Sequence, residues 1–229
     1  MSRVRQAAGG GRVVEVELAR VPAWLNRFAG RNDGLADVVA DPQRVLALAV
    51  DGTTASLAVP FPPMGLGPAD APLEPVEALI AHLERFRTVG VITVRSGAHS
   101  VGLARDIARE ATVTGSSTDR AYVQGRTAAG GWSQQRYARR RTGQRREAMA
   151  DTADTVARLL VPVARELDAL VTAGDTSAVS EVLADRRLAP LLGLPRRHFA
   201  DIPEPRRAVL DEVAARAGTV EITVVDPVR

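Results

Sequence analysis

Alternating apolar and polar positions predict strands in the first part of the chain. Residues 13–18 (VVEVEL) alternate and are rich in β-branched side chains, which is typical of a strand. Apolar runs at 45–50 and 55–61 flank Asp51-Gly52, and an Asp-Gly pair between two such runs is a strong hairpin signal. We therefore expect an N-terminal lobe that contains several short strands.

Two helices are expected beside these strands. Pro22 favours the first turn of a helix, which should stop near Gly30. Apolar residues recur at helical intervals across 76–86. The segment 60–75 holds six prolines, so we expect a loop there that marks the end of the N-terminal lobe.

The middle of the chain has a strand pattern followed by a long helix. We expect strands at 89–94, 100–104, 111–114 and 121–125, and a mobile loop at 127–131 (TAAGG). A helix should begin at Ser133 and end or kink at Pro162. Its apolar stripe recurs at intervals of four, three and four residues, at Met149, Ala153, Val156 and Leu160. Upstream of this stripe the turns carry Arg, Gln and Thr, so that half of the helix should project beyond the core.

Beyond the long helix, strand and helix patterns alternate. We expect strands at 168–174, 197–202 and 220–225, and helical segments at 177–183, 188–192 and 205–217. This alternation predicts an α/β fold with a partly parallel, mixed sheet flanked by helices. We expect three parts: a disordered lead (1–12), an N-terminal α+β lobe (13–75) and a second domain (76–229).

Composition and charge indicate the class of partner. All 30 basic residues are arginine, and the chain has no cysteine, which excludes disulfides, cysteine-ligated zinc and thiol catalysis. Eight arginines and no acidic residue lie between Arg120 and Arg146, whereas the rest of the chain has 22 arginines and 27 acidic residues. A basic block on a mildly acidic body favours a polyanion such as nucleic acid. A solvated helix face or a disordered arm is the alternative interpretation.

Other chemistries have little support. His82, His99 and His198 lie in three different predicted elements, and none has a second ligand at metal-binding spacing. The spacing of the acidic residues does not indicate the carboxylate cluster that a two-metal nuclease needs. We expect no metal and no cofactor. No apolar run is long enough to span a membrane, and no signal peptide is recognised.

The segment 130–141 (GGWSQQRYARRR) joins two glycines to the start of the long helix. Glycines let the backbone approach a ligand closely, and the free N–H groups of a helix start favour anions. Glutamine can orient a water molecule and donate to a developing oxyanion. At helical spacing the arginines behind it surround the helix rather than line one stripe, which suits a rod inserted among phosphates.

This segment resembles the catalytic loop and helix in the middle domain of eukaryotic and archaeal peptide release factors. Their pattern of Gly-Gly-Gln-Ser-x-x-Arg-aromatic-Ala-Arg-x-Arg is matched here at Ser133, Arg136, Tyr137, Ala138, Arg139 and Arg141. Trp132 stands where those factors place glutamine. The segment 131–134 instead fits the Gly-x-x-Gln form of release-factor-like peptidyl-tRNA hydrolases of ribosome-associated quality control. The chain resembles their actinobacterial, VLRF-type version over roughly 88–229.

The resemblance implies an RNase-H-like domain, similar to the release-factor middle domain, with a projecting arm at 126–146. It implies hydrolysis of the ester between nascent peptide and tRNA on stalled or split large ribosomal subunits. Gln134 should position the attacking water together with Gly130 and Gly131, and Gln135 takes this role if the loop register shifts by one. The residues expected to bind rRNA and tRNA are Arg126, Trp132, Arg136, Tyr137, Arg139, Arg140, Arg141, Arg145 and Arg146.

The expected protein is therefore a cytoplasmic monomer that rescues ribosomes, with the large ribosomal subunit and peptidyl-tRNA as partners. The alternative is a non-catalytic ribosome- or RNA-binding protein that keeps the arm and lacks hydrolysis. Trp132 either stacks on a base or ribose or closes the loop against the body.

Overall fold

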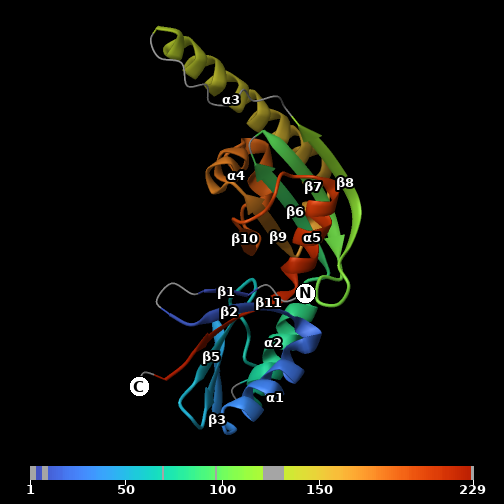
Figure 1. The fold of residues 1–229 in the computed structure, drawn as a ribbon. Helices are drawn as coiled ribbons and strands as arrows, with labels where there is room; N and C mark the ends of the chain where they lie inside the picture. Colours follow the sequence, from blue (N-terminus) through green and yellow to red (C-terminus); the bar gives the residue numbers. More distant parts are fainter. Residues whose placement is uncertain (1–3, 7–9, 69, 96, 121–131, 228–229) are drawn as a thin grey trace. The chain divides into compact units, whose positions relative to one another are not determined.

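The chain divides into two compact units. The structure, a computed structural model, describes residues 4–6, 10–68, 70–95, 97–120 and 132–227, of which 132–141 by their backbone alone. Unit 1 comprises Met1–Arg87, Asp106–Ala111 and Ala215–Arg229, and unit 2 comprises Thr88–Arg105 and Thr112–Ala214. Unit 1 is thus built from both ends of the chain (Figure 1).

Unit 1 contains a six-stranded antiparallel sheet. Its strands are β1 (Val4–Gln6), β2 (Arg12–Glu17), β3 (Leu35–Asp41), β4 (Arg44–Ala49), β5 (Thr54–Ala58) and β11 (Thr219–Val225). Their spatial order is β1-β2-β11-β5-β4-β3. Strand β11 lies in the middle, where Ile222 is opposite Val14 on one side and Leu57 on the other.

Two helices, α1 (Val21–Arg31) and α2 (Pro75–Glu84), cover one face of this sheet (Figure 1). The 3₁₀ turn η1 (Leu18–Arg20) precedes α1, and proline occupies the first turn of both helices. Leu25 and Phe28 of α1 and Leu79 and Leu83 of α2 are buried. Strands β4 and β5 form the hairpin expected around Asp51-Gly52, where Gly52 has a φ of 87°.

Unit 2 contains a five-stranded mixed sheet. Its strands are β6 (Thr88–Arg95), β7 (Ala98–Arg105), β8 (Thr112–Arg120), β9 (Ala169–Gly174) and β10 (Arg196–Phe199), in the order β10-β9-β6-β7-β8. The pairs β10·β9 and β9·β6 are parallel, whereas β6·β7 and β7·β8 are antiparallel. This is the mixed, partly parallel sheet of the predicted α/β fold.

Helices cover both faces of this second sheet. Helices α3 (Trp132–Leu160) and α4 (Thr176–Leu183) and the 3₁₀ helix η3 (Arg186–Leu191) share a core with Ile92 and Val101; the short 3₁₀ turn η2 (Ala164–Glu166) follows α3. Helix α5 (Arg207–Ala217) packs on the opposite face, toward which Gly102 points because strand residues alternate. A Cβ on Gly102 would lie 2.9 Å from a methyl carbon of Leu210, so this glycine allows the helix its close approach.

The structure differs from the predicted division in three places. Val4–Gln6, expected in a disordered lead, pair with β2 as β1, and Leu35–Asp41 form β3, which was not predicted. Helix α2 and strand β11 belong to unit 1, so the boundary expected at residue 75 does not coincide with the observed division. Strand β11 belongs to unit 1 because it is hydrogen-bonded to β2 on one side and to β5 on the other. The strand expected at 121–125 and the loop expected at 127–131 lie outside the described residues.

Candidate functional site

Helix α3 is the longest element and carries the predicted site. It has 29 residues, a length of roughly 43 Å at 1.5 Å per residue. Among its described side chains, which begin at Thr142, the first buried one is Ala148. About 24 Å of helix therefore precede Ala148, and Figure 1 shows this part extending beyond the sheet of unit 2. The predicted apolar stripe is confirmed, since all four of its residues are at most 5% exposed.

The predicted catalytic residues lie at or before the start of α3. Gly130, Gly131 and Arg126 are outside the described residues, whereas Gln134 and Gln135 are in the first turn of the helix. The first four N–H groups of a helix have no partner within it, so this end of α3 offers hydrogen-bond donors beside the two glutamines. Six of the predicted RNA-binding residues also lie in this first part of α3, where the structure describes the backbone alone. They are Trp132, Arg136, Tyr137, Arg139, Arg140 and Arg141.

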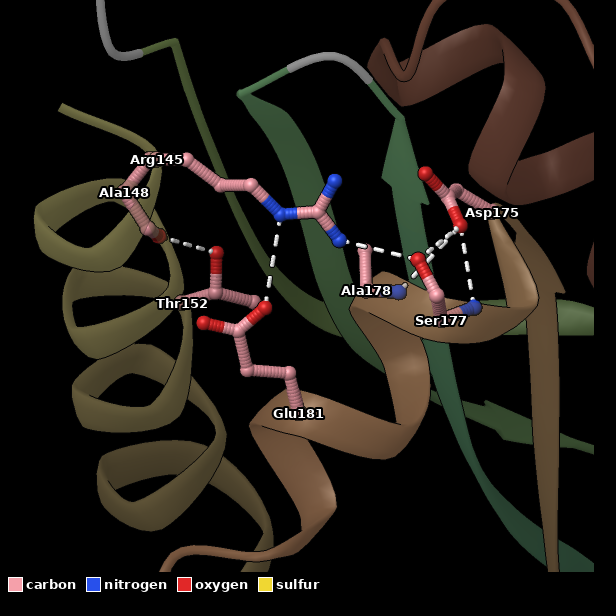
Figure 2. A network of polar contacts seen from close by, with 7 residues as sticks. All are labelled: Arg145, Ala148, Thr152, Asp175, Ser177, Ala178 and Glu181. Atoms are coloured by element: carbon pink, nitrogen blue, oxygen red, sulfur yellow. Dashed lines mark hydrogen bonds and ion pairs between the residues drawn. The ribbon is translucent and has the colours of Figure 1, made fainter. Parts of the chain in front are cut away.

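Arg145 lies at the base of the projecting half and contacts α4 (Figure 2). Its Nε is 3.4 Å from Oε2 of Glu181, and its Nη2 donates to Oγ of Ser177 at 2.9 Å. The guanidinium group expected to bind RNA thus already contacts a carboxylate and a hydroxyl of unit 2. Arg146, the next predicted RNA-binding residue, is exposed.

The partners of Arg145 are themselves held at the start of α4. Asp175 caps this helix, because its Oδ1 accepts hydrogen bonds from the N–H groups of Ser177 and Ala178 at 2.9 and 3.2 Å. The same oxygen accepts from the Ser177 hydroxyl at 2.8 Å (Figure 2). This hydroxyl bond is the main cause that lowers the pKa of Asp175, with smaller contributions from the two N–H groups and from the charge of Arg145.

A buried histidine joins the packed half of α3 to β7. His99 is 2% exposed, and its Nδ1 and Nε2 lie 3.1 and 3.2 Å from the hydroxyls of Thr152 and Thr155. Thr152 donates its hydroxyl proton to the carbonyl of Ala148 at 2.7 Å, so it must accept from the histidine. The neutral ring therefore carries its proton on Nδ1 and accepts at Nε2. Burial lowers the pKa of His99, although Asp119 and Asp151 act in the opposite direction.

Ion pairs and a hydrogen bond on the surface fix the same half of the helix. Arg187 of η3 is 2.6 Å from Asp154 of α3 and 2.7 Å from Asp185. Hydrogen bonds from the Arg187 side chain and backbone lower the pKa of Asp185 to about 2. On the other side, Arg158 donates to the hydroxyl of Ser117 in β8 at 3.2 Å. The C-terminal half of α3 is thus held by α4, η3, β7 and β8.

Sequence reasoning missed most of these anchoring residues. Nothing in the spacing relates His99 to Thr152, which lies 53 positions later. The cap at Asp175 did have a signal, because Asp-Thr-Ser directly before an apolar helical run is typical of a helix start.

The remaining histidines have local hydrogen-bonding roles. His82 in α2 has Nε2 2.8 Å from the Pro60 carbonyl oxygen, and His198 in β10 has Nδ1 3.0 Å from the Thr172 hydroxyl. In the described part of the chain, no group of three or more His, Asp or Glu residues is arranged to hold a metal ion. No helix in that part is long and apolar enough to cross a bilayer.

Several solved structures are weakly similar to this chain, among them the following three. The Vms1 mitochondrial localization core matches with a TM-score of 0.46 and 9% identity, covering 89% of this chain and 80% of that one. The archaeal translation termination factor aRF1 matches with a TM-score of 0.43 and 16% identity, covering 75% of this chain and 48% of that one. Archaeoglobus fulgidus Pelota matches with a TM-score of 0.31 and 11% identity, covering 95% of this chain and 67% of that one. With TM-scores below 0.5, these similarities carry no argument about this chain. No curated protein matches the sequence.

A family model gives the decisive comparison. It matches residues 87–223, which is more than half of the chain and runs from β6 through the arm into β11. The model describes the Actinobacteria/chloroflexi VLRF1 release factors. The chain therefore belongs to the acVLRF1 family of release factors.

Proposed function

We propose that this protein is a peptidyl-tRNA hydrolase that releases the nascent peptide from tRNA on stalled or split large ribosomal subunits. The proposal makes it a cytoplasmic ribosome-rescue factor that acts as a monomer. Membership of a release-factor family supports a role in translation. The observation that carries the finer proposal is the position of Gln134, in the first turn of a helix and about 21 Å along it from the buried Ala148.

The reaction needs a positioned water and a stabilised oxyanion. Water attacks the carbonyl carbon of the peptidyl ester, the carbonyl oxygen takes up negative charge, and the terminal ribose hydroxyl of tRNA leaves with a proton. The side-chain oxygen of Gln134 can accept a hydrogen bond from the water, and backbone N–H groups near the helix start can donate to the oxyanion. Glutamine does not titrate, so the protein contributes position and charge stabilisation while the ribosome supplies the surrounding site.

The charge of the arm fits this role. Arg136, Arg139, Arg140 and Arg141 occur within two turns of α3, and successive helical residues are rotated by about 100°. Basic residues therefore surround the helix axis, as a rod among rRNA and tRNA phosphates requires. Binding through these residues should weaken steeply as salt rises, because counterions are released from the RNA.

The test is release of labelled peptide from large-subunit–peptidyl-tRNA complexes. We expect Gln134→Ala to lower the rate by about 10²–10³-fold, as much as the loss of one preorganised amide hydrogen bond costs in other hydrolase active sites. The matched control is Gln144→Ala, the same change on the same helix about 15 Å away, which should keep the wild-type rate.

The other outcomes are distinct. If Gln135→Ala alone abolishes release, the function holds with the loop shifted by one residue. If the wild type binds the subunit and releases no peptide, the hydrolase proposal is wrong and the non-catalytic binding protein replaces it.

A further inference from the structure

Unit 1 has a pocket of about 310 Å³ at one end of α1. It opens between this helix and the strands β2 and β11, which run side by side. Its polar and aromatic lining consists of Arg12, Trp24, Arg27, Phe28, Arg31 and Asn32. The volume is at the lower end of the range of small-ligand sites, roughly 300–1,000 Å³, and the pocket lies in a different unit from the catalytic arm.

The floor of the pocket is aromatic. Trp24 and Phe28 are one helical turn apart, and their rings stack with centroids 5.5 Å apart and planes 9° apart. Phe28 is buried, whereas Trp24 is only partly buried and lines the pocket. A large ring held by a buried neighbour is a preorganised stacking platform for a planar group such as a nucleobase.

The rim of the pocket is positively charged. Arg27 and Arg31 lie on the same face of α1 as Trp24, and both are exposed. No acidic residue in the described part of the chain pairs with either of them. Arg12, across the pocket on β2, has Asp226 at 3.8 Å, and both of those side chains are more than half exposed.

Several other exposed arginines of unit 1 differ from Arg27 and Arg31. Each of four exposed ones has a carboxylate within 3.4 Å, and these are Arg5, Arg20, Arg44 and Arg109. Among the described residues, Arg27 and Arg31 thus differ from these four in having no carboxylate partner. Asn32 adds a polar group, since its Nδ2 donates to the Phe28 carbonyl at 2.7 Å and leaves the amide oxygen as an acceptor for a base edge.

We propose that this pocket binds a nucleotide, with the base stacked on Trp24 and the phosphate between Arg12, Arg27 and Arg31. Stacking on an aromatic ring combined with arginine contacts to phosphate is the chemistry that recognises unpaired nucleotides. The ligand is either an unpaired residue within RNA or a free nucleotide, which share this chemistry. Peptide release by the arm is not assumed, so the proposal stands or falls separately from the hydrolase activity.

The full chain offers a direct spectroscopic test. It has two tryptophans, so Trp132→Phe leaves Trp24 as the only tryptophan reporter. We expect hexauridylate to quench Trp24 fluorescence in this variant, because a stacked base quenches the indole. Adding Arg27→Gln and Arg31→Gln should weaken the apparent affinity at least tenfold. The matched control, Arg20→Gln with Arg44→Gln, removes the same charge from two paired arginines and should leave the affinity unchanged.

Further ligands distinguish RNA from free nucleotides as the source of the bound base, and they also define the results that would contradict the proposal. Quenching by hexauridylate at much lower concentration than by uridine monophosphate assigns the pocket to RNA, and similar concentrations assign it to free nucleotides. Equal quenching by inorganic phosphate would overturn the proposal, because it would show an anion site without base stacking. The proposal also fails if neither nucleotide quenches Trp24, or if the Arg27/Arg31 pair of changes has no effect in a variant with an unchanged circular dichroism spectrum.

Discussion

From Ala148 to Leu160, α3 buries an apolar stripe and two threonines against its own unit. From Trp132 to Arg146 the same helix carries six arginines and no acidic residue. The first of these segments resembles a core element, whereas the second has the composition of a nucleic-acid ligand. The difference shows how one continuous helix can separate stability from contact with a partner. The packed half fixes the direction of the arm, and the other half carries the charge.

The strongest way to test this separation is to damage the packed half. Leu160 is fully buried, so Leu160→Ala should lower the free energy of unfolding by about 2–5 kcal/mol. Peptide release per folded molecule should stay within twofold of the wild type at a temperature where the variant is folded. Arg146→Ala, an exposed change on the same helix, should alter stability by less than about 0.5 kcal/mol. Loss of release by folded Leu160→Ala would show that the two halves are coupled.

The complementary change removes charge from the projecting half. Replacing Arg136, Arg139, Arg140 and Arg141 by glutamine should weaken binding to large ribosomal subunits. The slope of log affinity against log salt should become shallower by roughly 0.7–0.9 for each phosphate that the arm no longer binds, while the melting temperature hardly changes. The control removes four exposed arginines elsewhere: Arg44, Arg109, Arg165 and Arg206. An equal change in slope for the control would mean that binding depends on net charge alone.

Acid should weaken the packed half through His99. Burial lowers its folded-state pKa below the ordinary 6.5, so the unfolded chain binds the proton more readily. Stability is therefore complete above about pH 6.5 and falls as the pH drops from there toward the folded-state pKa. Urea unfolding at pH 7.5 and 5.5 measures this fall, and His99→Asn should reduce it. Burial lowers the pKa of His82 and His198 too, so part of the fall should remain.

The smallest expected effect is at the junction between the halves. The Arg145–Glu181 pair is 46% and 42% exposed, and such pairs contribute about 0.2–1 kcal/mol. A double-mutant cycle with Arg145→Gln and Glu181→Gln should give a coupling energy in that range by thermal unfolding. If Arg145 mainly positions the arm, Glu181→Gln should slow peptide release as Arg145→Gln does. If Arg145 mainly contacts RNA, only the arginine change should matter.

The sequence alone was enough to predict elements whose signals are local. The stripe from Met149 to Leu160, the hairpin at Asp51-Gly52 and the mixed sheet are present in the structure. Strand β3 was missed because its acidic residues hide the pattern and none of its side chains is buried. The position of β11 between β2 and β5 could not be predicted from the sequence either, because both partner strands lie more than 160 positions earlier in the chain.

The candidate site divides in the same way. The order of glycines, glutamines and arginines is a local motif, and its helical part starts at Trp132 as α3. The roles of Gln134 and Gln135 and of the arm arginines stay predictions. The anchoring contacts of His99, Glu181 and Arg187 depend on distant segments meeting in space, which no spacing rule reveals.

The central place of β11 also sets an order for folding during synthesis. All five strands of unit 2 and its helices α3 and α4 are translated before Thr219. At that point the sheet of unit 1 still has a gap between β2 and β5. Unit 2 can therefore pack while the chain is still being made, but the first 60 residues must wait for β11 to close their sheet. The sheet of the N-terminal lobe, although its first strands are synthesised early, is completed only once β11 is available.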